Sequence, residues 1–171
     1  MMRHYLYIGP ADIRRAVAAA PAGTTITSYH DLDAWTRNAQ SWPPRTDTLI
    51  ATFVVNEAGF LCLADRHSEH VACARGQPVL SAGEITLVRS RDGWEVSEIS
   101  NQSTGYCPEP ESWPSVAYAL DSIGIPHPDY FTALCIFRRC LNCRQIAIVK
   151  DDVYRCEVCG SELPKTWNLA L

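Results

Sequence analysis

The chain has 171 residues, of which 47% are hydrophobic and 20% are charged, and its net charge is −4. These values are ordinary for one globular domain with a small appendage. The longest apolar runs, such as residues 49–55, are far shorter than the ~20 residues that a membrane-spanning helix needs. The first ten residues lack the apolar stretch of a secretory signal. We therefore expect a cytoplasmic protein with no membrane segment.

The charge is distributed unevenly along the chain. Residues 1–137 carry 9 Lys and Arg against 15 Asp and Glu, whereas residues 138–171 carry 6 against 4. Phosphate binding depends on clustered basic side chains. The cluster formed by Arg138, Arg139 and Arg144 is explained equally well as a solvated loop, so a nucleic-acid partner is disfavoured.

The N-terminal region is predicted to contain a short strand and two helices. Residues 5–8 favour the strand, and a helix follows from Pro10, because proline is accepted in the first turn of a helix. Ser28 is the predicted N-cap of the second helix, with Asp31 completing a capping box. This second helix is expected to end at the Trp-Pro-Pro sequence of residues 42–44.

The next part of the chain has the pattern of β-strands. Residues 49–55 are rich in β-branched side chains and residues 60–63 resume the apolar run, which predicts a hairpin. Residues 71–74 are interpreted as a third strand. Residues 84–89 and 94–99 flank an Arg-Asp-Gly turn and predict a second hairpin. The predicted fold class is α+β, with an antiparallel sheet of about five strands covered on one face by helices.

A loop, a helix and a strand are predicted after this sheet. Glycine and proline interrupt residues 101–113, which indicates a long loop. A helix is expected over residues 114–122, with Gly124 as its C-cap. The apolar residues 131–137 then predict a buried strand that leads into the C-terminal cysteines.

Four cysteines near the C-terminus form two Cys-x-x-Cys pairs, Cys140 with Cys143 and Cys156 with Cys159. Each pair can bend around one side of a tetrahedral ion, and the intervening segment is long enough for a hairpin that brings the pairs together. We expect one structural Zn²⁺ per chain, because four thiolates leave no open position for a reactive water. Iron held by the same four thiolates is the chemical alternative.

This segment resembles the zinc-ribbon family. It has all four cysteines, two short predicted strands at residues 146–149 and 153–154 around an Asp-Asp turn, and Gly160 directly after the last cysteine. The resemblance covers roughly residues 138–164 and implies a zinc ion that holds two knuckles. Zinc ribbons serve in nucleic-acid binding, protein docking and plain stabilisation, so the resemblance implies no single function.

The predicted organisation is a main domain followed by a zinc ribbon. The main domain spans residues 1–137, with a helical part at 1–45, the sheet at 47–100, the loop at 101–113 and a helix and strand at 114–137; the ribbon and its tail span residues 138–171. Residues 60–164 also resemble uncharacterised bacterial proteins in which a small α+β domain precedes a zinc ribbon. That second resemblance implies no activity.

The other four cysteines, Cys62, Cys73, Cys107 and Cys135, lack the spacing of a secreted disulfide scaffold. We predict that they remain reduced. Cys62 and Cys135 lie in apolar stretches, so we expect most of these thiols to be buried.

A second polar cluster, formed by Asp65, His67, Glu69 and His70, lies at a predicted strand turn. If the strand continued, Asp65 and His67 would share a face, and a carboxylate beside an imidazole could orient a general base. The alternatives are a polar turn that satisfies backbone donors and a second metal site.

The loop at residues 101–111 is a further candidate site, because it carries Tyr106 and Cys107 next to two carboxylates. Its alternative is a solvated connector.

Three functions remain open from the sequence. The first is a zinc-binding adaptor that contacts a protein partner through the ribbon knuckles, the tail around Trp167 and the acidic main domain. The second is a small hydrolase or transferase with a small-molecule substrate, whose polar cluster faces the 101–111 loop. The third is a nucleic-acid-binding module. The enzyme hypothesis requires a cavity that joins the two candidate segments.

Overall fold

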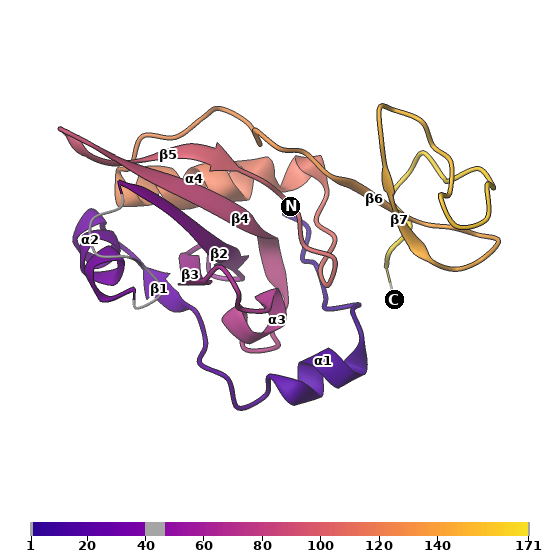
Figure 1. The fold of residues 1–171 in the computed structure, drawn as a ribbon, viewed down its shortest axis with the longest axis horizontal. Coiled ribbons are helices and arrows are strands. Elements are labelled where there is room, and N and C mark those ends of the chain that lie inside the picture. The colour runs from indigo at the N-terminus through magenta and orange to yellow at the C-terminus, as the bar shows by residue number, and fades with distance from the viewer. Residues whose placement is uncertain (1, 40–46, 171) are drawn as a thin grey trace.

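The structure of the protein is a computed structural model that describes residues 2–39 and 47–170, so the predicted break at residues 42–44 lies outside it. Figure 1 shows a main domain followed by a small two-stranded unit. The elements are α1 (Ala11–Ala16), β1 (Thr24–Ile26), α2 (Tyr29–Asn38), β2 (Thr48–Asn56), β3 (Leu61–Asp65), α3 (His70–Cys73), β4 (Val79–Ser90), β5 (Gly93–Ile99), the 3₁₀ turn η1 (Pro110–Ser112), α4 (Trp113–Ile123), β6 (Ile136–Arg139) and β7 (Ile146–Val149).

The main sheet has five antiparallel strands in the order β1-β3-β2-β4-β5. Both predicted hairpins are present, β2 with β3 and β4 with β5. Gly59 and Gly93 sit at their turns with φ of 84° and 119°, a backbone region that glycine adopts without steric penalty. The predicted α+β fold class with a five-stranded antiparallel sheet is therefore confirmed.

Helices α2 and α4 cover one face of this sheet. Leu32 of α2 and Val116 and Leu120 of α4 belong to the same buried cluster as Phe53 of β2 and Ile85 of β4. Burial of such side chains is the main favourable contribution to folding, at roughly 1.5–3 kcal/mol for each. This cluster is the main core of the protein.

Helices α1 and α3 lie on the opposite face (Figure 1). Val54 and Ala82 of the sheet pack there against Val71 of α3, with Ile13 of α1 at the margin of the cluster. The prediction that helices cover a single face is therefore wrong. Because both faces are covered, residues on both sides of β2 are buried, and its sequence is a nearly continuous apolar run.

The predicted ends of two helices agree with the structure. Ser28 Oγ accepts a hydrogen bond from the Asp31 backbone N at 3.2 Å, which caps α2. The Asp31 carboxylate accepts hydrogen bonds from the backbone and hydroxyl of Thr27, so the reciprocal bond of the capping box goes to the residue before the cap. Gly124 ends α4 with φ of 78°.

Three local predictions for the main domain differ from the structure. Residues 71–74 were predicted as a strand, but His70–Cys73 form the short helix α3, because a four-residue apolar run fits either element. Strand β1 was not predicted, since only one of its three residues is buried. Residues 5–8 form no named strand, although Tyr5 makes an isolated bridge to Val79.

The link from the main domain to the ribbon also differs from the prediction. The strand expected at residues 131–137 is replaced by β6, which begins only at Ile136 and pairs with β7 rather than with the main sheet. Residues 101–109 are irregular as predicted, and the end of the predicted loop is occupied by η1 and by Trp113, the first residue of α4. In the described part of the chain, no helix is long and apolar enough to span a membrane.

Candidate metal centre

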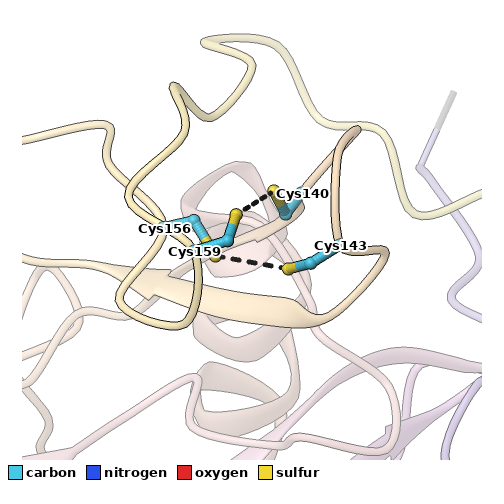
Figure 2. A group of neighbouring side chains, drawn as sticks. All are labelled: Cys140, Cys143, Cys156 and Cys159. Atoms are coloured by element: carbon cyan, nitrogen blue, oxygen red, sulfur yellow. Dashed lines mark hydrogen bonds between the residues drawn. The ribbon is translucent and has the colours of Figure 1, made fainter.

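The four predicted metal ligands lie together in the ribbon (Figure 2). Their sulfur atoms all lie within 4.8 Å of one another. Cys140 Sγ is 3.6 Å from Cys159 Sγ, and Cys143 Sγ is 3.6 Å from Cys156 Sγ. Zinc–sulfur bonds of ~2.3 Å in a tetrahedron place the sulfurs roughly 3.8 Å apart. The four cysteines can therefore hold one metal ion.

The two knuckles have the same backbone hydrogen bonds. In the first, Cys140 N donates to Gln145 O at 2.8 Å; in the second, Cys156 N donates to Ser161 O at 2.8 Å. The residue after each second cysteine has a positive φ, 65° at Arg144 and 75° at Gly160. Gly160 adopts this region without strain, whereas a non-glycine residue there is uncommon. The backbone of both knuckles is thus shaped to turn two sulfurs toward one point.

The hairpin between the knuckles differs from the prediction. Residues 153–154 were expected to pair with residues 146–149, but β7 pairs with β6. Asp151 and Asp152 do form a turn, with φ of 50° and 57°. Beyond that turn, residue 153 makes only an isolated bridge to Lys150. The first cysteine pair therefore follows one strand of a two-stranded sheet directly and is held by it.

The thiols strongly influence one another's protonation. The side-chain and backbone hydrogen bonds of Ser161 hold the pKa of the Cys159 thiol at about 5. At Cys143, a hydrogen bond from the Gln145 backbone lowers the pKa, but desolvation and the neighbouring thiols outweigh it and raise the pKa to about 12. Four adjacent thiolates repel one another unless a cation lies between them. A bound metal ion supplies that charge and displaces the remaining protons.

Arg138 fastens the ribbon to the main domain. It is only 4% exposed, and its Nη1 donates to Glu109 Oε1 at 2.7 Å. Its Nε and Nη2 donate to the backbone oxygens of Pro164 and Lys165 in the C-terminal tail. The interpretation of Arg138 as part of a solvated basic cluster is therefore wrong. The pairing of Glu109 with Arg138 was not predicted, because the two residues lie 29 positions apart and no local pattern marks the pair.

The predicted acid–base cluster lies in the turn between β3 and α3. Strand β3 ends at Asp65, so the expected shared strand face does not extend to His67. The Asp65 Oδ1 accepts a hydrogen bond from the backbone N of His67 at 2.8 Å. The side chains of His67 and Glu69 are exposed. His70 is mostly buried, and its Nε2 lies 3.0 Å from the backbone oxygen of Gly83 in β4. Desolvation lowers the pKa of its imidazole.

The two candidate residues of the loop have structural contacts. The Tyr106 hydroxyl donates to Gln77 O at 2.8 Å, and the side chain is buried. Cys107 is fully buried, its Sγ donates to Thr104 O at 3.3 Å, and desolvation raises the pKa of its thiol to about 12. A thiol in this state is a poor nucleophile.

The six residues of the enzyme hypothesis line none of the cavities of about 750, 490 and 290 Å³ among the described residues. Catalysis by those residues stays a prediction, and these cavities give it no support. Cys62, Cys73, Cys107 and Cys135 are free thiols in the structure, and the first three are buried.

No protein-family model matches the chain, and no curated protein or solved structure matches it. The resemblance of residues 60–164 to uncharacterised bacterial proteins therefore has no support from these comparisons. The assignment of a metal site is therefore based on the positions of its four cysteines alone.

Proposed function

We propose that the protein is a zinc-containing adaptor whose ribbon binds a protein partner. Four thiolates at tetrahedral spacing suit zinc, and with all positions filled the ion has a structural role. A closed four-thiolate site is the usual form of a structural zinc site, and iron in the same ligands is the alternative that metal analysis distinguishes. A reducing compartment keeps the thiols of the proposed site available to the metal, which supports a location in the cytoplasm.

The observation that carries the partner proposal is the exposure of one apolar side chain on each knuckle. Leu141 is 63% exposed and Val158 is 68% exposed. Each lies between the two cysteines of its pair, so the metal fixes its backbone and prevents it from folding inward. Rigid exposed apolar groups are typical of protein-binding sites, because burying them costs little conformational entropy.

The charges of the ribbon favour a protein over a nucleic acid. Arg138 is buried in an ion pair with Glu109, so it does not contribute to a basic surface. Lys150 pairs with Glu157 at 2.7 Å. A phosphate-binding face needs several free cations on one side, and these pairings reduce their number.

Metal analysis tests the zinc part of the proposal. We expect one equivalent of zinc per chain in protein purified under reducing conditions, and less than about 0.1 equivalent in Cys143→Ser. Elemental analysis measures both. A coloured protein with one equivalent of iron, or less than half an equivalent of any metal, would contradict the assignment. Cys135→Ser is the matched control, because Cys135 is a free cysteine outside the metal set.

Partner capture tests the adaptor part of the proposal. We expect Leu141→Ser combined with Val158→Ser to lose the partners that crosslink to the wild-type protein in its source cells, while zinc content stays at one equivalent. Tyr118→Ser combined with Tyr130→Ser is the control, because these side chains are 62% and 68% exposed but lie in the main domain. Partners that are retained by the knuckle variant and lost by the control variant would place the binding surface on the main domain instead.

A further inference from the structure

The cavity of about 750 Å³ lies where the N-terminal segment, the 101–113 loop and the C-terminal tail meet. Its lining includes the charged side chains of Arg3, Glu109, Arg138 and Lys165 and the aromatic ring of Trp167. A volume of this size is in the range of sites for metabolite-sized ligands. The cavity contains none of the four cysteines of the metal centre.

The lining of the cavity includes the buried ion pair of Arg138 with Glu109, and Arg138 has one donor without a partner among the described residues. The Arg138 guanidinium has five N–H donors, and four of them reach Glu109, Phe137 O, Pro164 O and Lys165 O. The fifth, on Nη2, makes no hydrogen bond within the described residues. Arg138 lines the cavity, so an acceptor of a ligand bound there could take this remaining donor.

One wall of the cavity is an aromatic ring held in a fixed position. The Trp167 indole Nε1 donates to Cys107 O at 3.3 Å, and the ring packs edge-on against Tyr5 at 5.9 Å between centroids. The guanidinium of Arg3 lies 4.5 Å from the centroid of the Trp167 ring. Arg3 covers one face of the ring, so a planar apolar group could pack beside this guanidinium, against the part of Trp167 that lines the cavity.

The free charges of the cavity are mainly positive. Among residues 2–39 and 47–170, Arg3 and Lys165 form no ion pair, although both line the cavity. Glu109 is neutralised by Arg138, so its charge is not available to a ligand. The exposed Glu111 offsets one of the two free cations. One net positive charge therefore remains for a ligand.

We propose that this cavity binds an organic anion with a planar apolar body. Its anionic oxygens accept hydrogen bonds from Arg3, Lys165 and the free Nη2–H of Arg138, and its body packs against Trp167. The site is separate from the metal centre and from the knuckle surface, so it does not depend on the proposed adaptor function. Carboxylates and phosphate esters share this chemistry, and the test includes both.

The probes are 3-phenylpropanoate, phenyl phosphate and the neutral alcohol 3-phenylpropanol, added to the zinc-loaded full chain. The indole N–H resonances in ¹H–¹⁵N spectra report on the site, with Trp167→Phe identifying the Trp167 signal. We expect an anionic probe to shift the Trp167 signal saturably and to leave that of Trp94, in the sheet core, unchanged. The alcohol should bind at least about tenfold more weakly, because it lacks the charge.

Charge-reversal variants locate the anion. Arg3→Glu and Lys165→Glu should each weaken probe binding about three- to tenfold, since exposed charge pairs contribute modestly. Arg91→Glu makes the same change at the exposed β4–β5 turn and should leave binding unchanged. Tighter binding of phenyl phosphate than of 3-phenylpropanoate would support a phosphate ester as the natural anion, and the reverse order would support a carboxylate.

Three results would overturn the proposal. The first is the absence of a saturable shift of the Trp167 signal with either anion at concentrations up to roughly 10 mM, which would mean that neither anion binds with a Kd in the millimolar range or tighter. The second is equal binding of 3-phenylpropanol, which would show a merely apolar cavity. The third is an equal loss of binding in Arg91→Glu, which would show attraction to the whole protein rather than to this site.

Discussion

The main domain and the ribbon are held together by different means. In the described residues, the larger core cluster of the main domain contains twenty buried hydrophobic side chains. The ribbon cluster contains five, and two of those are the proposed ligands Cys140 and Cys156. A unit below about 40 residues rarely buries enough apolar surface to fold alone. The sheet is therefore stabilised by its core, whereas the ribbon is expected to depend on the metal ion proposed for its four cysteines and on its contacts with the main domain.

The two units meet at a junction with both apolar and polar contacts. Phe137 of β6 and Leu169 of the tail are buried together with Cys107 of the loop. Arg138 links β6 to the loop and to the C-terminal tail. The side chain of Asn168 bonds both backbone groups of Arg139, at 2.9 Å to the N and 2.7 Å to the O. These directional bonds fix the orientation of the ribbon more than they contribute to net stability, because burying an ion pair has a large desolvation penalty.

Metal removal should produce the largest difference in stability between the main domain and the ribbon. A structural zinc site contributes an apparent ~10–16 kcal/mol to folding in small modules, and the ribbon has little else to replace it. We expect a chelator under reducing conditions to abolish amide protection in residues 138–164 while β2 and β4 stay protected. Hydrogen exchange with mass spectrometry measures both regions. Equal loss of protection in the sheet would show that the units fold as one, and retained protection in the ribbon would show that the metal is dispensable.

A change in the sheet core should have the opposite effect: it should destabilise the main domain and leave the metal content of the ribbon unchanged. Phe53 lies on the central strand β2 and is fully buried. Phe53→Ala should lower the free energy of unfolding by about 3–5 kcal/mol, because it removes apolar contacts and leaves a cavity. Metal content per folded chain should not change. Urea denaturation gives the loss, and Phe60→Ala is the control, since Phe60 is 43% exposed beside the same hairpin turn. A comparable loss in the control would refute the assignment of stability to this core.

A change at the junction should have a smaller effect that reaches both units. Glu109→Gln leaves the Arg138 guanidinium buried without a counter-charge, at a cost of roughly 3 kcal/mol. Hydrogen exchange should rise in the C-terminal tail as well as in the loop. Glu111→Gln, at an exposed neighbouring site, should change stability by less than about 0.5 kcal/mol. Replacing both partners, as Glu109→Leu with Arg138→Met, should recover part of the loss. No recovery would mean that the ion pair, or the hydrogen bonds of Arg138 to three backbone oxygens, are net stabilising.

The features predicted correctly from sequence are those with a local cause. The hairpins follow from β-branched runs around Gly59 and Gly93, because a turn and its flanking strands are encoded within a few residues. The clustering of the four C-terminal cysteines follows from their spacing, because two Cys-x-x-Cys pairs limit the geometry available to their sulfurs. In both cases the residues that interact are close in sequence or are marked by their chemistry.

The features that were missed have distant causes. The Arg138–Glu109 pair joins residues far apart in sequence, and a lone arginine in a polar stretch does not indicate burial. Both faces of the sheet are covered because α1 and α3 pack against the face opposite to α2 and α4. The pattern of apolar residues in the strands does not specify where these helices pack. The short helix α3 was predicted as a strand because four apolar residues carry too little periodicity to decide.

The smallest expected effect is a pH dependence that arises in the main domain alone. Desolvation holds the pKa of His70 below its usual 6.5, so the native state keeps the imidazole neutral while the unfolded chain takes up a proton as the pH falls. The unfolded state then binds more protons, so the free energy of unfolding should fall as the pH drops below about 6.5.

His70→Gln removes this group, and its denaturation midpoint should depend less on pH between 7.5 and 5 than that of the wild type. His67→Gln, exposed in the same turn, is the control and should keep the wild-type slope. Metal release in acid acts on all three proteins alike, so an identical slope in His70→Gln would refute a contribution from this buried imidazole.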